Sequence, residues 1–222
     1  MSIRVLLVDD QALLRTGFRM ILSAQPDLEV VGEAADGADA VRQVPLLRPD
    51  VVLMDVRMPV MDGVAATAAI VADGGSARVL VLTTFDVDEY AFAALRAGAS
   101  GFLLKDVPPA ELGAAIRAVA AGDAVVSPRI TRQLLDRVSL HTPGVGDEHG
   151  DRTAVLAALT EREREVFGEI ARGFSNAEIA ARLYLSEATV KTHITRVLAK
   201  LQLRDRVQVV IFAYEHDLLD DR

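Results

Sequence analysis

The stretch Val51-Val52-Leu53-Met54-Asp55 decides the fold of the first half of this 222-residue chain. Its four apolar residues, two of them β-branched, stand between Pro49-Asp50 and Met58-Pro59, and they predict a short strand buried on both faces. In an open parallel sheet, ligands lie beside the carboxyl ends of the strands. The sequence therefore places Asp55 at a candidate reaction centre.

A second strand is predicted over residues 3–8, and it too is followed by acid, at Asp9 and Asp10. Carboxylates gathered at neighbouring strand ends repel one another strongly unless a cation lies among them. Oxygen ligands, with no cysteine and no nearby histidine, are those that Mg²⁺ prefers. We therefore expect Asp9, Asp10 and Asp55 to form a magnesium site.

The composition is that of an ordinary soluble protein, with 25% charged and 51% apolar residues, and the length favours two cores. The absence of cysteine excludes disulfides and thiolate metal sites and fits a reducing compartment. No apolar run approaches the ~18 residues needed to span a bilayer, and the chain enters a strand without a signal-peptide pattern. We expect a cytoplasmic protein that does not bind membranes.

The net charge of −8 hides an asymmetry that bears on nucleic-acid binding. Residues 1–122 hold 10 Lys and Arg against 16 Asp and Glu, a balance of −6. Residues 182–206 hold six basic residues against two acidic ones, a balance of +4. Because a polyanion is bound by a local basic surface, the second segment is a candidate nucleic-acid interface.

The first 122 residues alternate strand patterns with helical spacing, which predicts an α/β fold with right-handed crossovers and a doubly wound, five-stranded parallel sheet. A glycine-rich phosphate loop does not follow the first strand, which weighs against a dinucleotide fold. The five strands are predicted over residues 3–8, 29–34, 50–54, 78–82 and 100–104.

Residues 123–154 change character and predict a linker between two domains, residues 1–122 and 155–222. A helix is expected near Pro128 to Val138. The polar, glycine-rich segment 141–150 that follows is typical of a flexible connection.

The remainder predicts a small all-α domain. Thr160-Glu161-Arg162-Glu163 fits a capping box for a helix that should stop at Gly173. Ser175-Asn176-Ala177-Glu178 is a second capping box, for a short helix ending near Leu183. Ser186 should cap a third, basic helix over 187–201. Two short helices joined by a tight turn favour a helix-turn-helix, although the turn Tyr184-Leu185 lacks the common glycine.

Two further polar residues belong at the edge where the carboxylates meet. Thr83 follows the fourth predicted strand and Lys105 follows the fifth. An aspartate, a hydroxyl, an ammonium and a magnesium site together can accept a phosphoryl group and hold its charge.

These motifs resemble known families. The first half, with Asp9-Asp10, Asp55, Met58-Pro59, Asp62-Gly63, Thr83, and Phe102 three residues before Lys105, resembles the receiver domain of bacterial response regulators. The second half resembles a LuxR-type DNA-binding domain through Thr160 to Glu163, Ile179-Ala180, Leu185-Ser186, Thr189 to His193 and Lys200-Leu201. The combination resembles the NarL/FixJ family of response-regulator transcription factors.

The resemblance implies that a sensor histidine kinase phosphorylates Asp55, and that phosphorylation promotes dimerisation and sequence-specific binding of double-stranded DNA. It also implies Mg²⁺ held by Asp10, Asp55 and the Arg57 backbone carbonyl, with Asp9 acting mostly through bound water. Thr83 and Lys105 would bond the phosphoryl oxygens. Phe102 would be the switch aromatic, where Tyr is the commoner choice.

On the basic helix the resemblance places the base-reading positions at Lys191, Thr192 and Thr195. The spacing agrees, because these residues share a face. The opposite face should pack into the domain through Val190, Ile194, Val197 and Leu201. Phosphate contacts are expected from Arg196, Lys200, Arg204 and Arg206.

Two side chains and one apolar segment can be interpreted in more than one way. His193 and Tyr184 fit either a phosphate contact or packing between helices. The final apolar segment, Val207 to Tyr214, is wider than one core-facing stripe requires, so we expect part of it to meet a partner subunit.

Two alternative functions remain at this point. A magnesium-dependent phosphohydrolase would use the same carboxylates, but the first domain has little spare sequence for a substrate cap. A DNA-binding protein could instead use its receiver only as a dimerisation scaffold. We expect a regulator that is not an enzyme, apart from slow self-dephosphorylation.

Overall fold

The computed structural model describes residues 2–83, 89–122, 156–216 and 218. The chain divides into two compact units, residues 1–126 and 127–222, and each unit is described by itself. The predicted linker 123–154, with its expected helix, lies outside the described residues. The predicted domain bounds therefore stay a prediction.

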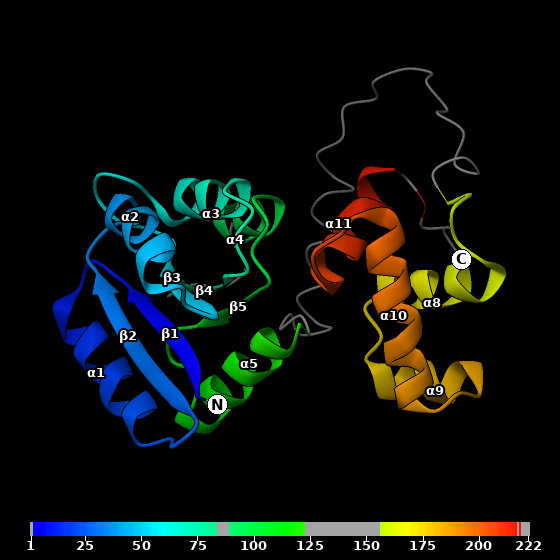
Figure 1. Ribbon diagram of the computed structural model, residues 1–222, viewed down its shortest axis with the longest axis horizontal. Helices are drawn as coiled ribbons and strands as arrows, with labels where there is room; N and C mark the ends of the chain where they lie inside the picture. Colours follow the sequence, from blue (N-terminus) through cyan, green and yellow to red (C-terminus); the bar gives the residue numbers. More distant parts are fainter. Residues whose placement is uncertain (1, 84–88, 123–155, 217, 219–222) are drawn as a thin grey trace. The chain divides into compact units, whose positions relative to one another are not determined.

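The first unit is a five-stranded parallel sheet in the order β2-β1-β3-β4-β5, so the α/β prediction is confirmed. Helices α1 and α5 cover one face, and α2, α3 and α4 cover the other (Figure 1). Each predicted strand lies within one residue of the observed one at either end. The elements are β1 (Ile3–Val8), α1 (Ala12–Ser23), β2 (Leu28–Ala34), α2 (Gly37–Leu47), β3 (Val51–Asp55), α3 (Gly63–Ala72), β4 (Arg78–Thr83), α4 (Glu89–Arg96), β5 (Gly101–Leu104) and α5 (Pro109–Ala121).

The central strand β3 is buried along its whole length, as its apolar run predicts. Its neighbours β1 and β4 run parallel to it, with Leu53 in register with Leu7 and Leu80. On one face these three leucines pack against Phe18 of α1 and Ile116 of α5. Burial on both faces fixes β3, and therefore the direction in which its last residue leaves the sheet.

Gly63 is required by a close approach of two backbone segments. Its N–H donates to the Val56 carbonyl at 2.9 Å, which folds the loop after β3 back onto the strand end. A Cβ at Gly63 would stand 2.0 Å from the Asp55 carbonyl oxygen, far inside van der Waals contact. Asp62 then begins α3, because its side chain accepts a hydrogen bond from the Ala65 amide at 2.8 Å.

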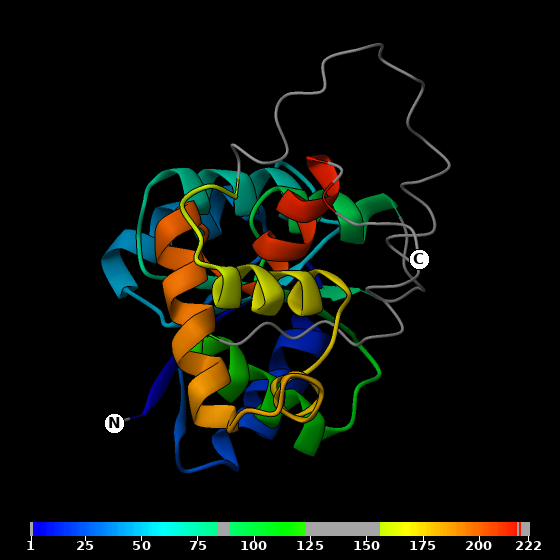
Figure 2. The ribbon, with the colours of Figure 1, turned by 90° about the vertical axis from the view of Figure 1, so that its right-hand side faces the viewer.

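The second unit is helical in its described part, as predicted. In Figure 2, α10 crosses α8, while α11 and α9 lie on opposite sides of α8. Both predicted capping boxes form, and Gly173, at φ 84°, follows the end of α8. The helices are α8 (Glu161–Ala171), α9 (Asn176–Leu183), α10 (Glu187–Leu201) and α11 (Arg206–Glu215).

The turn between α9 and α10 is made without glycine. Tyr184 ends α9 in the left-handed conformation, at φ 55°, and its N–H bonds the Ala180 carbonyl. Its side chain is 95% exposed, so the interpretation that Tyr184 packs between helices is wrong. His193 is half-buried, and Ser186 caps α10 by accepting from the Thr189 amide at 3.1 Å.

The apolar segment near the C-terminus forms α11. Val207, Val209 and Ala213 are buried, whereas Val210 and Ile211 remain partly exposed. The helix therefore has more apolar surface than the core covers, and the expected partner contact stays a prediction. Within the described residues, no helix is long and apolar enough to cross a membrane.

We expect Gly63→Ala and Gly17→Ala to change stability in opposite directions. At Gly63 the added Cβ meets backbone, so the free energy of unfolding should fall by roughly 1–3 kcal/mol or more. Gly17 lies inside α1 with no atom within 4 Å of an added Cβ, so Ala should raise stability by about 0.5–1 kcal/mol through helix propensity. Urea unfolding followed by circular dichroism measures both. A Gly63→Ala variant as stable as wild type would contradict the close approach.

Candidate functional site

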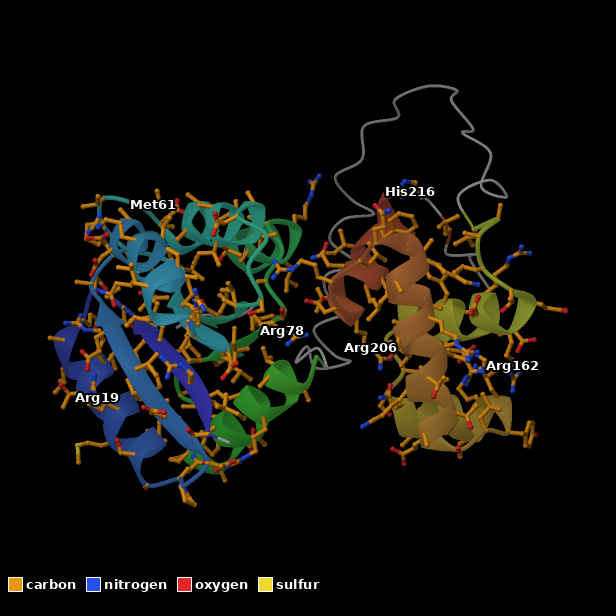
Figure 3. The ribbon with its side chains drawn as sticks, in the orientation of Figure 1. Arg19, Met61, Arg78, Arg162, Arg206 and His216 are labelled. Atoms are coloured by element: carbon orange, nitrogen blue, oxygen red, sulfur yellow. The ribbon has the colours of Figure 1, made fainter. Side chains whose placement is uncertain are left out.

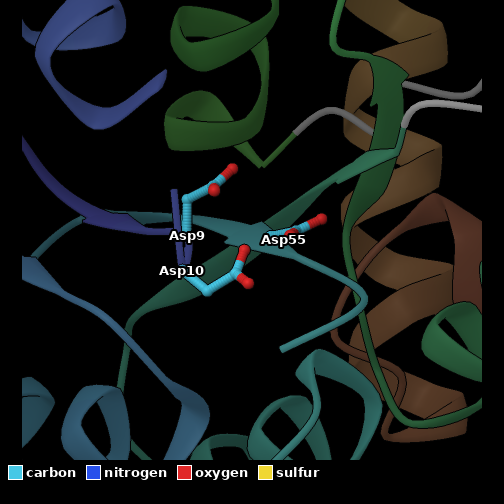
Figure 4. Close-up of side chains that lie close together, drawn as sticks. All are labelled: Asp9, Asp10 and Asp55. Atoms are coloured by element: carbon cyan, nitrogen blue, oxygen red, sulfur yellow. The ribbon is translucent and has the colours of Figure 1, made fainter. Parts of the chain in front are cut away.

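The carboxyl edge of the sheet gathers the predicted polar residues. Asp9 follows β1, Asp55 is the last residue of β3, and Asp10 follows Asp9 (Figure 4). Carboxylate oxygens of these three residues lie within 4.8 Å of one another. The predicted cluster of acidic side chains therefore forms.

The side chain of Lys105 partly offsets the negative charge of this cluster. Its ammonium lies 2.7 Å from Asp9 Oδ2 and 3.0 Å from Asp55 Oδ2, and its side chain is only 6% exposed. Asp9 and Asp55 are also buried, at 3% and 5% exposure, whereas Asp10 is exposed. One ammonium thus bridges two of the three carboxylates and leaves the third open to solvent.

Burial raises the pKa of Asp55 above its ordinary value. The hydrogen bond and charge of Lys105 oppose this shift of the pKa, and the Asp9 carboxylate adds to it. A site that resists a negative charge on Asp55 binds a further cation favourably. The donor set, oxygen atoms of three carboxylates at close range, fits Mg²⁺.

A surface hollow adjoins the acidic cluster, which gives an incoming group access from solvent. Its lining includes the exposed Arg57, whose backbone carbonyl is the fourth predicted metal ligand. The other lining residues are Asp10, Val56, Met58, Pro59 and Asp62.

Thr83 and Phe102 occupy the strands beside Asp55. Thr83 ends β4 half-buried, and its carbonyl accepts a hydrogen bond from the Lys105 amide at 2.8 Å. Phe102 lies in β5, in register with Val81, and is 2% exposed. The two residues predicted to bind the phosphoryl oxygens are therefore joined by a backbone hydrogen bond at the ends of adjacent strands.

Helix α10 divides into the two faces that its sequence predicts. Val190 and Val197 are buried in the core of the second unit, whereas Lys191, Thr192 and Thr195 are exposed. The Thr192 hydroxyl donates to the Ala188 carbonyl at 3.0 Å, and Thr195 does the same to Lys191. Both hydroxyl oxygens keep lone pairs that can accept a bond from a base or a water.

The four predicted phosphate contacts differ in their surroundings. Arg196 is exposed on α10. Lys200 forms an ion pair with Glu163 of α8, with 2.6 Å between Nζ and Oε2. Arg206, labelled in Figure 3, donates to Asn176 Oδ1 at 2.8 Å, and Arg204 is half-buried. Arg196 and Lys200 are exposed and Arg206, like Arg204, is half-buried, and the contacts of all four with DNA stay predictions.

Sequence reasoning missed two contacts that bear on these sites. Arg15 of α1 donates to the Asp9 backbone carbonyl at 2.6 Å, and Glu163, read only as a capping residue, also holds Lys200. Periodicity along one helix carries no signal for either contact, because each joins two different elements.

Comparison with known proteins agrees with this division of the chain. Residues 5–117 match the family described as "Response regulator receiver domain", and residues 157–213 match "Bacterial regulatory proteins, luxR family". The chain is 42% identical over 221 residues to the "Uncharacterized transcriptional regulatory protein YxjL" of Bacillus subtilis, with 98% of each chain covered. It is 39% identical to "Response regulator protein VraR" of Staphylococcus aureus, over 99% of this chain and 100% of that protein.

The chain belongs to the response regulators that carry a LuxR-type DNA-binding domain.

Solved structures of response regulators show the same architecture. The response regulator ChrA of a heme-sensing two-component system matches 98% of this chain and 99% of its own, with 37% identity and a TM-score of 0.53. The signal receiver domain of the putative response regulator NarL from Mycobacterium tuberculosis matches 55% of this chain and 98% of its own, with 40% identity and a TM-score of 0.53.

In this response regulator, Glu163 joins two helices of the DNA-binding unit. Its carboxylate accepts from the Thr160 amide at 2.8 Å and lies 2.6 Å from the Lys200 ammonium. The Lys200 bond, followed by the Thr160 amide, lowers the pKa of Glu163 to about 2. The stability that this carboxylate contributes is complete above its ordinary pKa of 4.5 and is lost as the pH falls through about 2.

We expect Lys200→Met to raise the pKa of Glu163 toward 4.5, because the ammonium is the main cause of the lowered value. Acid unfolding of the second unit should then begin at higher pH than in wild type. A pH titration of the Glu163 carboxyl carbon by NMR measures the pKa directly. Lys191→Met removes a charge from the exposed face of the same helix and should leave this pKa unchanged. A wild-type Glu163 that titrates near 4.5 would contradict the ion pair.

Proposed function

We propose that a sensor histidine kinase phosphorylates this regulator on Asp55, and that the modification promotes dimerisation and binding of double-stranded DNA. The observation that carries the proposal is the buried Asp55 carboxylate, with the Lys105 ammonium at 3.0 Å and Asp9 and Asp10 beside it. Asp55 lies at the carboxyl edge of a parallel sheet, where such folds bind ligands.

The side chains around Asp55 have distinct tasks in the transfer. A carboxylate oxygen of Asp55 attacks phosphorus, the bond from phosphorus to the donor nitrogen breaks, and that nitrogen leaves with the electron pair. Lys105 stabilises the charge on the phosphoryl oxygens, because it already lies within reach of Asp55. Asp9, Asp10, Asp55 and the Arg57 carbonyl would hold Mg²⁺, which supplies electrostatic stabilisation of the transferring group.

The phosphoryl group acts by shifting a conformational equilibrium, with Thr83 moving toward it and Phe102 filling the space behind. Support comes from their positions, because Thr83 ends the strand next to β3 and Phe102 lies buried on the next strand along. A ligand shifts such an equilibrium only through its different interaction with the two states. The Thr83 hydroxyl is the group that gives phosphate this preference.

The DNA-binding unit then places α10 in the major groove as one of a symmetric pair. Lys191, Thr192 and Thr195 would face the bases, and the exposed Arg196 would hold a backbone phosphate. Lys200, Arg204 and Arg206 would add phosphate contacts around them.

The regulator acts in the cytoplasm and turns over no substrate beyond slow loss of its own phosphoryl group. Support comes from the family, because residues 5–117 match a receiver domain and residues 157–213 match a LuxR-type DNA-binding domain. A phosphohydrolase would need further structure to enclose a substrate.

We expect a small phosphodonor such as acetyl phosphate to add one phosphoryl group to wild type in the presence of Mg²⁺, because Asp55 is the buried nucleophile. Asp55→Asn should gain none. Thr83→Ala should gain the group yet bind DNA no more tightly for it, because the hydroxyl links phosphate to the switch. Intact mass and fluorescence anisotropy with labelled DNA measure the two effects.

Three outcomes separate the proposal from its alternatives. Full labelling of Asp55→Asn, or of wild type in excess chelator, would contradict the assignment of acceptor and metal. Continuous consumption of phosphodonor without a mass gain would indicate a hydrolase. Labelled wild type and labelled Thr83→Ala binding DNA equally well would remove Thr83 from the switch.

We expect Lys191→Ala and Arg196→Ala to weaken DNA binding in different ways. Loss of a base contact should cost about 1–3 kcal/mol on the cognate site and relax discrimination at one base pair. Loss of a phosphate contact should weaken all sequences alike and reduce the salt dependence by about one unit of slope. Binding of specific and random DNA over a range of salt concentrations measures both. An equal loss on the two DNAs for Lys191→Ala would place Lys191 among the phosphate contacts.

A further inference from the structure

Arg15 of α1 connects the loop that carries the acidic pair to the edge of the sheet. Its Nη1 donates to the Asp9 backbone carbonyl at 2.6 Å, and its Nε pairs with Glu33 Oε2 of β2 at 3.1 Å. The side chain is 17% exposed, so most of it is enclosed. Arg19, labelled in Figure 3 and one helical turn further along α1, pairs with the other oxygen of Glu33 at 2.5 Å and is 45% exposed.

The hydrogen bond from Arg15 is one of four contacts that hold Asp9 in place. The Asp9 amide donates to the Ala34 carbonyl at 3.2 Å, one carboxylate oxygen accepts from the Gln11 amide at 2.8 Å, and the other pairs with Lys105. Arg15 takes the remaining polar atom, the backbone carbonyl. β1 ends at Val8, so this carbonyl lies beyond the strand, and the side chain of Arg15 gives it a hydrogen bond there.

The orientation of this carbonyl determines where Asp10 points. The peptide bond between Asp9 and Asp10 is planar, so fixing the Asp9 carbonyl also fixes the direction of the next N–Cα bond. Asp10 is exposed at the rim of the hollow. Its carboxylate therefore depends on its backbone for direction, and Arg15 is the side chain that holds that backbone.

We propose that Arg15 is a positioning residue for the metal site, which sets the direction of the Asp10 carboxylate by holding the peptide between Asp9 and Asp10. This inference rests on the proposed function, because it assumes that these carboxylates bind Mg²⁺. Arg15 does not touch the ion. Its planar guanidinium reaches the carbonyl and Glu33 at once through two different nitrogens, which a lysine ammonium cannot reproduce.

The charge of Arg15 and its positioning effect act on Mg²⁺ affinity in opposite directions. A positive charge near the site repels a cation, so removing it by Arg15→Met would strengthen Mg²⁺ binding if charge were its only influence. Loss of the bond to the Asp9 carbonyl loosens a metal ligand and weakens binding. The sign of the change therefore identifies which effect is present.

The test compares Mg²⁺ binding to full-length wild type, Arg15→Met, Arg15→Lys and Arg19→Met by isothermal titration calorimetry. Arg19→Met is the matched control, because it removes a cation from the same helix and the same carboxylate without touching Asp9. We expect the Mg²⁺ Kd of Arg15→Met to rise about tenfold, the lower end of the effect of residues that orient metal ligands. Arg15→Lys keeps the charge but not the fork, and its Kd should also rise.

Two further readouts separate positioning from general damage. The half-saturating Mg²⁺ concentration for labelling by acetyl phosphate should rise in Arg15→Met, while the labelling rate at saturating Mg²⁺ stays that of wild type. Both Arg15→Met and Arg19→Met lose one pairing with Glu33, and Arg15→Met also loses the bond to the Asp9 carbonyl, so its thermal midpoint should be the lower of the two. Mg²⁺ binding and labelling are therefore compared at a temperature where both variants are fully folded.

The possible outcomes test the positioning role of Arg15 and the metal site separately. Unchanged or tighter Mg²⁺ binding by Arg15→Met, or wild-type affinity in Arg15→Lys, overturns the positioning role while the proposed function stands. Equal weakening in Arg19→Met also overturns it, because the Glu33 network would then be responsible. The metal site itself, and the inference with it, is overturned if wild type shows no saturable Mg²⁺ binding. It is also overturned if Asp10→Asn binds Mg²⁺ with the affinity of wild type.

Discussion

Three carboxylates, with oxygen atoms within 4.8 Å of one another, repel one another at the carboxyl edge of the sheet. The structure of the receiver unit must offset this repulsion. Lys105 offsets it from inside the protein by bridging Asp9 and Asp55, and its own burial makes the interaction stronger than a surface pair would be. The backbone holds the charges close, because each is attached to a strand that the core packs on both sides. The same arrangement that costs folding free energy favours a cation beside the carboxylates.

The loop after β3 shows how closely the site and the fold are joined. Gly63 lies against the Asp55 carbonyl because the chain must turn back directly after the strand to begin α3. That turn leaves Asp55 buried at the end of β3 and brings Arg57 to the lining of the hollow. Gly63 is not one of the predicted binding residues, yet the position of Asp55 depends on it.

The sequence alone predicts the strands and helices that depend on a local pattern of residues. The apolar run of β3 and the capping boxes at Thr160 and Ser175 are local signals, and the strands and helices that they predict are present. Convergence of Asp9 and Asp55 could be inferred because parallel strands end at one edge. Contacts between separate elements could not, because nothing in the spacing of Arg15 or Lys200 names the group that each will meet. The exposure of Tyr184 was equally hidden, since an aromatic residue between helices usually packs.

The double role of Glu163 has a consequence for how the second unit meets DNA. One carboxylate joins the first turn of α8 to the last turn of α10, so the end of α10 is held against fraying before any encounter with DNA. The conformational entropy of that helix is therefore lost when the unit folds, and binding to DNA does not require a second loss. Docking can then proceed as the collision of preformed surfaces, with an association rate governed by orientation and by electrostatic steering rather than by a folding step.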